Sequence, residues 1–165
     1  MYCYATIFSM DNVFDKFKER KAKAESLYKS QKNIFNSYLK KEVVFNSDGF
    51  HHLQFSSRRE RSKEEQILKF NLLPSAIEII KKSKTLQEYR KDITTVGGKC
   101  RDGLFHTRNV EYWGFVAILG DPGRMIKVKT ILRRIGDGNV TFWSVMPFSK
   151  LKNGQKLHSF GIEDE

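Results

Sequence analysis

Paired cysteines, long apolar runs and recognisable metal-ligand motifs are all missing from this chain of 165 residues. Its two cysteines, Cys3 and Cys100, belong to no Cys-x-x-Cys pair, which argues against a disulfide or a zinc cluster and is typical of a reducing compartment. No P-loop, GxGxxG, His-Glu-x-x-His or paired acidic metal motif occurs. A metal-dependent nuclease is therefore disfavoured, and we expect no metal and no cofactor.

Membrane-directed segments are also lacking. The longest apolar run, Trp113–Leu119 interrupted only by Gly114, is far too short to cross a bilayer. The segment Met1–Ala5 has neither the basic start nor the apolar centre of a signal peptide. We therefore expect a cytoplasmic protein without membrane attachment.

Positive charge is what the chain has in excess. It contains 30 Lys and Arg residues against 19 Asp and Glu residues, a net charge of +11. The basic residues are spread along the whole chain and 13% of residues are aromatic, which favours a folded basic surface over a disordered arm. A polyanionic partner is expected, either nucleic acid or an acidic protein, and phosphate binding should weaken steeply with salt.

The N-terminal quarter has a helical pattern without proline or glycine. Apolar residues recur at spacings of three and four, and they are Val13, Phe17, Ala24, Leu27, Ile34 and Tyr38. This pattern predicts one long amphipathic helix over Asp11–Lys41, whose lysines form a solvated face. A paired coiled coil, and with it a dimer through this helix, is the alternative.

Two shorter helices are expected after a brief strand. Glu42–Phe45 has β-type residues and is followed by Asn46–Gly49, a cluster that favours a tight turn. Ser62 with Glu65 forms a capping box at the start of one helix, and Pro74 starts a second. A further helical piece is expected through Leu86 and Tyr89.

The second half predicts β-structure after a loop over Asp92–Asn109. Three strands follow closely, separated by two Gly- and Asp-containing turns, and they are Val110–Leu119, Arg124–Ile135 and Val140–Met146. Short connections make this an antiparallel β-meander. The fold class is therefore α+β, with N-terminal helices packed on a C-terminal antiparallel sheet.

The middle strand alternates between an apolar and a cationic face. One face carries Ile126, Val128, Thr130 and Leu132, and the other carries Met125, Lys127, Lys129, Ile131 and Arg133. We expect the first face to pack on the helices and the second to be cationic.

The chemistry that these residues suit is metal-free RNA cleavage, in which the ribose 2′-hydroxyl attacks the phosphate. It requires a base, an acid and a group that stabilises negative charge. His51 and His52 supply imidazoles, which titrate near neutral pH. The candidates for binding phosphate or donating a hydrogen bond are Arg58, Arg59, Arg61, Lys127, Lys129, Thr141 and Ser144.

Each candidate also has a structural interpretation. Adjacent histidines in a regular element point apart, so at least one of His51 and His52 is structural or solvated. The arginines fit a solvated loop equally well, and the two strand lysines fit the solvent side of the sheet. The aromatic residues Trp113, Phe142 and Trp143 fit the core better than a base-stacking platform.

Six short segments between Val43 and Pro147 carry a family resemblance. They are Val44–Leu53, Arg61–Gln66, Leu72–Pro74, Tyr112–Gly114, Lys127–Val128 and Phe142–Val145. Together they resemble the phage-associated nuclease domains of the barnase, EndoU, colicin and RelE-like superfamily. Residues 1–42, with the long helix, and the tail 148–165 lie outside the resemblance.

The resemblance implies a metal-independent RNase on a fold of helices packed against an antiparallel sheet, used as a toxin or in phage conflict. It assigns the family's histidine to His52, its basic residue to Arg61, its strand lysine to Lys127 and its strand hydroxyl to Ser144. Their neighbours could take these roles instead as substrate-binding residues, and they are His51, Arg58, Arg59 and Lys129.

The sequence therefore predicts a single-domain endoribonuclease, residues 1–165, that cleaves RNA by transesterification. It would be the toxin of a toxin–antitoxin pair, neutralised by an acidic antitoxin or immunity protein. One alternative is a non-catalytic nucleic-acid-binding module on the same fold. The other is a domain that only engages an acidic protein.

Overall fold

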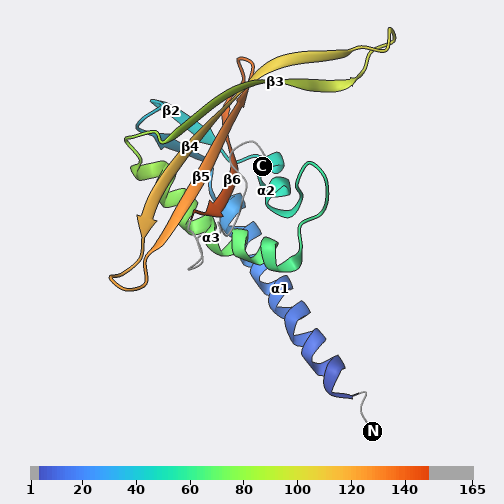
Figure 1. The fold of residues 1–165 in the computed structure, drawn as a ribbon, viewed down its shortest axis with the longest axis vertical. Helices are drawn as coiled ribbons and strands as arrows, with labels where there is room; N and C mark the ends of the chain where they lie inside the picture. Colours follow the sequence, from blue (N-terminus) through green and yellow to red (C-terminus); the bar gives the residue numbers. More distant parts are fainter. Residues whose placement is uncertain (1–3, 149–165) are drawn as a thin grey trace, which may run out of the picture.

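The computed structural model describes residues 4–148, which form three helices and one six-stranded sheet (Figure 1). The helices are α1 (Tyr4–Ser30), α2 (Ser47–Gln54) and α3 (Lys63–Lys82). The strands are β1 (Asn33–Asn36), β2 (Lys41–Val44), β3 (Glu88–Lys99), β4 (Phe105–Leu119), β5 (Ile126–Ile135) and β6 (Val140–Pro147). The α+β class expected from the sequence is confirmed.

The sheet has the strand order β1-β2-β6-β5-β4-β3. The expected meander is present as β4, β5 and β6, and β3 extends it by one antiparallel strand. The sheet is not wholly antiparallel, because β2 pairs in parallel with β6. That pairing is short, joining Val43 to Val140 and Val44 to Thr141. The rest of β6 is therefore left for other elements to cover.

The helices α1 and α3 lie on one face of the sheet. α3 packs across β4, β5 and β6, and α1 packs against α3. Leu73 and Ile77 of α3 share one buried cluster with Phe115, Val128 and Phe142 of the strands. This cluster is the main hydrophobic core, and its burial is the largest favourable contribution to folding.

The N-terminal helix is shorter than the sequence predicts. The helix expected over Asp11–Lys41 ends at Ser30, and the β1–β2 hairpin follows it. The fully buried Asn36 stabilises the hairpin, because its side chain accepts a hydrogen bond from the Leu39 N–H at 2.9 Å and donates one to the Ile80 carbonyl at 2.9 Å. A contact with the end of α3, distant in sequence, thus overrides the local helical pattern.

The segment expected as a turn, Asn46–Gly49, instead begins helix α2. Asn46 is the N-cap, and its side chain accepts a hydrogen bond from the Gly49 N–H at 3.1 Å. Gly49 has to be small, since a Cβ there would overlap the Phe142 carbonyl oxygen and the Tyr28 hydroxyl. This close approach seats α2 against β6 and brings His52 to that strand.

Helix α3 begins as expected and continues further. Ser62 and Glu65 form both hydrogen bonds of the capping box. The second helix expected to start at Pro74 is instead the continuation of α3. Proline removes one hydrogen bond of the helix, but the buried Leu73 and Ile77 on either side hold this helix against the sheet.

The segment after α3 is β-structure rather than the helix and loop that the sequence predicts. The helical piece expected through Leu86 and Tyr89 and the loop expected over Asp92–Asn109 are replaced by β3 and the first part of β4. The two strands form an antiparallel hairpin with an irregular register between Val96 and Lys99.

The outer part of this hairpin extends beyond the sheet. β5 ends at Ile135, which pairs with Val110 of β4. Among the described residues, the pairing of β3 and β4 beyond that point is with each other, apart from one hydrogen bond from the Gly136 N–H to the Asn109 carbonyl at 2.7 Å. The ribbon of residues 93–109 projects from the body (Figure 1). We call residues 93–109 the arm.

Candidate active site beside strand β6

Strand β6 is irregular where α2 and α3 lie beside it. The register between β5 and β6 shifts between Ile131, which pairs with Ser144, and Leu132, which pairs with Phe142. Trp143 is therefore the extra residue of a β-bulge. Bulges change the direction of side chains, and here the Trp143 ring stacks on a side chain of α2.

Trp143 lies between an imidazole and a guanidinium. The His52 ring stacks on it with 4.0 Å between ring centroids, and the Arg133 Cζ lies 3.3 Å from the ring centre. The imidazole and the guanidinium would overlap if both lay on the same face of the indole. They therefore occupy opposite faces of the Trp143 ring. His52 is only 6% exposed. Burial lowers the pKa of the Arg133 guanidinium, and nearby Tyr112 and Asp48 partly offset this effect.

Arg61 contacts the same histidine from the loop before α3. Its Nε donates to the His52 carbonyl at 3.3 Å, and its Nη2 lies 3.4 Å from His52 Nε2. A guanidinium has only donors, so this contact assigns the lone pair to Nε2 and the proton of a neutral ring to Nδ1. The Arg61 backbone N–H bonds to the Gln54 carbonyl at 2.9 Å, which fixes the loop against the end of α2.

A buried lysine of α3 completes this region. The Lys69 Nζ donates to the Ser144 hydroxyl at 2.9 Å and to the Val145 carbonyl at 3.1 Å. Lys69 is 3% exposed and Ser144 is fully buried. We call His52, Arg61, Lys69, Arg133, Trp143 and Ser144 the His52 cluster.

Three of the four residues that the sequence assigns to catalysis lie in this cluster, namely His52, Arg61 and Ser144. The fourth, Lys127, is exposed on β5, and its ammonium lies 4.7 Å from the centre of the Phe148 ring. Three members were not assigned a role from the sequence. They are Lys69, Arg133 and Trp143.

The predicted substrate-binding residues near the histidines lie outside the cluster. His51 is exposed and stacks on Phe55 with 4.4 Å between ring centroids. Arg59 pairs with Glu65 at 3.1 Å, and Arg58 is exposed in the same loop. Adjacent histidines thus point apart, as the sequence predicts for a regular element, with His52 inward and His51 outward.

Lys129 contradicts the expectation of a cationic, solvent-facing strand surface. It is 1% exposed, and its ammonium pairs with Glu88 of β3 at 2.6 Å. Ile131 and Met146 on this side of the sheet are also buried, in a second small cluster. Of the two strand lysines, only Lys127 is exposed.

The sequence contains a signal for Lys69 that the helical pattern alone did not reveal. Lys69 and the fully buried Leu73 are four residues apart on α3, so they share the face that packs on the sheet. A charged residue within an apolar helical stripe is rarely buried without a partner, and it therefore marks a polar site. Arg133 and Trp143 had no such signal, because the bulge that brings them together depends on strand register.

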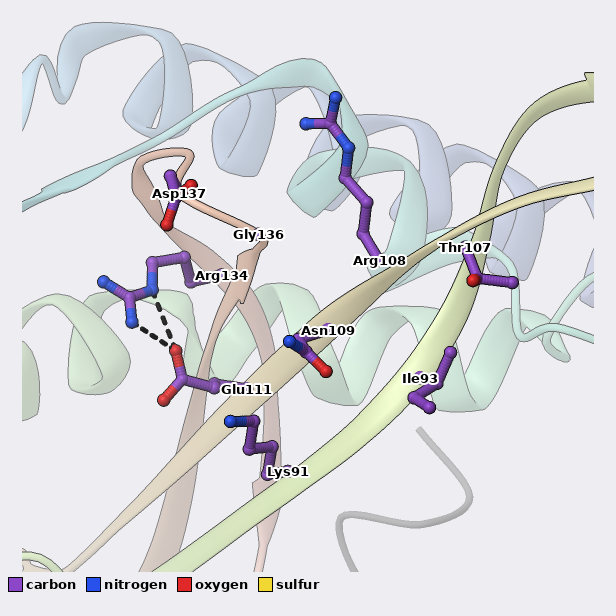
Figure 2. A pocket seen from close by; sticks show the side chains of 9 residues that line it. All are labelled: Lys91, Ile93, Thr107, Arg108, Asn109, Glu111, Arg134, Gly136 and Asp137. Atoms are coloured by element: carbon purple, nitrogen blue, oxygen red, sulfur yellow. Dashed lines mark hydrogen bonds and ion pairs between the residues drawn. The ribbon is translucent and has the colours of Figure 1, made fainter.

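A second polar surface lies at the base of the arm. An open hollow there is lined by the cations Lys91, Arg108 and Arg134 and by the carboxylates Glu111 and Asp137, with neutral residues between them. The Arg134 Nε donates to Glu111 at 2.9 Å. Figure 2 shows this pair joined by two contacts, with the Arg108 side chain extending away from it. Arg108 thus remains available to an external anion.

Within residues 4–148, no group of three or more His, Cys, Asp or Glu residues is placed to hold a metal ion. None of the helices in this range combines the length and apolar character needed to span a membrane. His158 and Cys3 lie outside the described residues. Comparison with protein-family models, with curated proteins and with solved structures finds no match to this chain.

Proposed function

We propose that the protein is a metal-independent endoribonuclease whose active site is the His52 cluster. The observation that carries the proposal is the approach of Arg61 Nη2 to within 3.4 Å of His52 Nε2. A phosphate held by that guanidinium would have the adjacent ribose 2′-hydroxyl close to Nε2. Nε2 carries the lone pair of a neutral ring, so it would accept the hydroxyl proton once the Arg61 guanidinium donates to the phosphate instead of to Nε2.

The remaining cations suit the negative charge that develops on the phosphate. Arg133 and Lys69 bring a guanidinium and an ammonium to the same stretch of β6, the role that the sequence assigned to Lys127. Arg133 Nε and Trp143 Nε1 are buried and have no hydrogen-bond partner within the described part of the chain. Buried donors are usually satisfied, so a bound phosphate oxygen would account for them. Ser144 would hold the Lys69 ammonium in place.

The reaction that follows from these roles is transesterification. The 2′-oxygen attacks the phosphorus as His52 removes its proton, the bond to the 5′-oxygen breaks, and a 2′,3′-cyclic phosphate remains. The 5′-oxygen leaves with a proton from an acid. In-line attack puts the 2′- and 5′-oxygens on opposite sides of the phosphorus, so His52 as the base leaves this proton to a second donor, for which water suffices, and the protonated His52 returns its own proton to solvent.

The broader role is proposed from charge. A net charge of +11 suits a toxin that acts on RNA in the cytoplasm and is neutralised by an acidic antitoxin or immunity protein. The acidic protein would cover the same cations that hold phosphate.

One observation favours the second candidate, a nucleic-acid-binding module without catalysis. His52 is 6% exposed and stacks on Trp143, which is also how a structural histidine packs. In that case the cations would bind phosphate and no bond would be cut.

The test is to incubate the full chain with total RNA in EDTA and to map the ends. We expect discrete cuts with 2′,3′-cyclic phosphate ends, and no cut at a site carrying a 2′-O-methyl group, because that group removes the nucleophile. Intact RNA that is retained by the protein would favour the binding module. Intact RNA that is not bound would overturn both.

A further inference from the structure

The arm has the shape of an element that contacts a large partner. Its outer β3 segment from Ile93 to Lys99 spans about 20 Å at the rise of a strand, and it pairs only with β4 (Figure 1). A two-stranded ribbon is marginally stable in water, and this one lies outside the core. Binding to a partner would explain why this ribbon lies outside the core.

The charges on the arm favour a polyanion. It carries Lys99, Arg101 and Arg108 against the single carboxylate of Asp102. All four residues are exposed. Within residues 4–148 none of the three cations forms an ion pair, although other exposed cations of the chain do, such as Lys29 and Lys82. These three charges are therefore available to external phosphates.

The uncharged residues of the arm suit the surface of an RNA duplex. Hydroxyl and amide side chains lie along both strands, on Thr94, Thr95, Thr107 and Asn109. The minor groove of A-form RNA is wide and shallow and displays 2′-hydroxyl groups, which both donate and accept hydrogen bonds. Phosphates border this groove on each side, within reach of long cationic side chains.

The register of the sheet places the base of the arm two strands from Arg133 of the His52 cluster. Arg133 of β5 pairs with Tyr112 of β4, which pairs with Arg90 of β3. These side chains share one face of the sheet, and Arg90 lies about 10 Å from Arg133 across two strand spacings. The arm begins three residues after Arg90, and its Arg108 pairs with Thr94 and lies beside Gly136 of the turn after β5, at the base of the arm.

We propose that the arm binds base-paired RNA along its minor groove, with Lys99, Arg101 and Arg108 on the flanking phosphates. The paired segment is then positioned so that an adjacent unpaired linkage enters the His52 cluster. Unpaired RNA is required there, because the 2′-oxygen of an A-form strand is not in line with the bond that breaks. The binding of duplex is independent of the proposed function, and only the delivery of the linkage rests on it.

The test measures affinity for a blunt RNA duplex of about 16 base pairs, the length that one double-stranded RNA-binding domain covers. Such a duplex offers no unpaired linkage, so binding is read without cleavage. The arm variant carries Lys99→Ala, Arg101→Ala and Arg108→Ala. The matched control carries Lys32→Ala, Lys81→Ala and Lys84→Ala, three exposed cations on the body whose loss lowers the net charge by the same amount.

We expect the arm variant to bind the duplex at least about tenfold more weakly at physiological salt. The slope of log affinity against log salt should fall by about 3, roughly one unit for each phosphate contact that is lost. The body variant should bind nearly as the unaltered chain does. Circular dichroism should show no change of fold in either, since all six side chains are exposed.

Two results would overturn the proposal. One is equal affinity of the arm and body variants for the duplex. The other is dimerisation through the arm: the unaltered chain would sediment as a dimer, and the variant Leu104→Ser with Phe105→Ser would be a monomer with unchanged RNA affinity. The exposed tip of the arm would then dock a second copy of the chain. Failure of the proposed function would look different from failure of this proposal. In that case the unaltered chain would cut no RNA, but the arm variant would still lose affinity for the duplex.

Discussion

Replacing Trp143 with alanine should destabilise the protein by an amount that follows from its two stacked neighbours. Stacking on the His52 ring at 4.0 Å contributes about 1 kcal/mol, and the Arg133 guanidinium at 3.3 Å contributes about 2 kcal/mol because it is largely desolvated. Lost packing brings the sum into the range of about 3–5 kcal/mol seen for such truncations. The melting temperature of a protein of this size should then fall by about 10 °C.

The assay is urea unfolding followed by far-ultraviolet circular dichroism, for Trp143→Ala, Arg133→Met and the double variant. The two side chains are in contact, so we expect a coupling free energy of about 1–2 kcal/mol between the substitutions. A loss below about 1 kcal/mol for Trp143→Ala, or additive effects, would show that the indole is not held between its neighbours. The geometry of the His52 cluster would then be wrong.

Two further substitutions test the parts of the fold that carry the site and the arm. Asn36→Leu removes the donor to the Ile80 carbonyl and leaves buried backbone groups unpaired. Urea unfolding should therefore show that the free energy of unfolding falls by about 2–5 kcal/mol. A fall below about 1 kcal/mol would contradict the hairpin geometry. Hydrogen bonds from Tyr89 and then from Arg134 hold the pKa of Glu111 below its usual value. The ionised form therefore contributes to stability at pH values above the unfolded-state pKa. This contribution is lost as the pH falls through the lower folded-state pKa. Glu111→Gln should therefore cost about 1 kcal/mol at pH 7 and progressively less below about pH 4, and a cost independent of pH would refute the pairing.

The elements with strong local signals were predictable from the sequence. Ser62 and Glu65 mark the start of α3 because a capping box needs only residues three apart. The alternation in Arg124–Ile135 predicted β5, and short glycine-containing turns predicted its antiparallel neighbours. In each case the information lies within a few residues of the element.

The arm and the β1–β2 hairpin were not predictable in the same way. Gly97 and Gly103 look like loop residues, yet they supply positive φ of 73° and 85° within and at the tip of a paired ribbon. The hairpin depends on a contact between Asn36 and the end of α3, 44 residues away. Pairing between segments distant in sequence decided both structures, and no local pattern contains it.

The candidate site was only partly predictable, because some of its residues are brought together by contacts between segments that are distant in sequence. The residue types of His52, Arg61 and Ser144 suggested the chemistry, but nothing local distinguishes the buried His52 from the exposed His51. Lys69 joins the site through helix packing, and Trp143 joins it through a bulge. The first depends on tertiary packing and the second on strand register.

The most direct test of the central claim compares His52→Asn with His51→Asn in RNA cleavage with EDTA present. The two residues are neighbours, and His51 serves as the matched control because it lies outside the cluster on an exposed surface. We predict that His52→Asn slows cleavage by about 10²–10⁴-fold, the usual contribution of a general acid–base group, whereas His51→Asn retains roughly the full rate. Cleavage by His52→Asn at the rate of the unaltered chain would contradict the account.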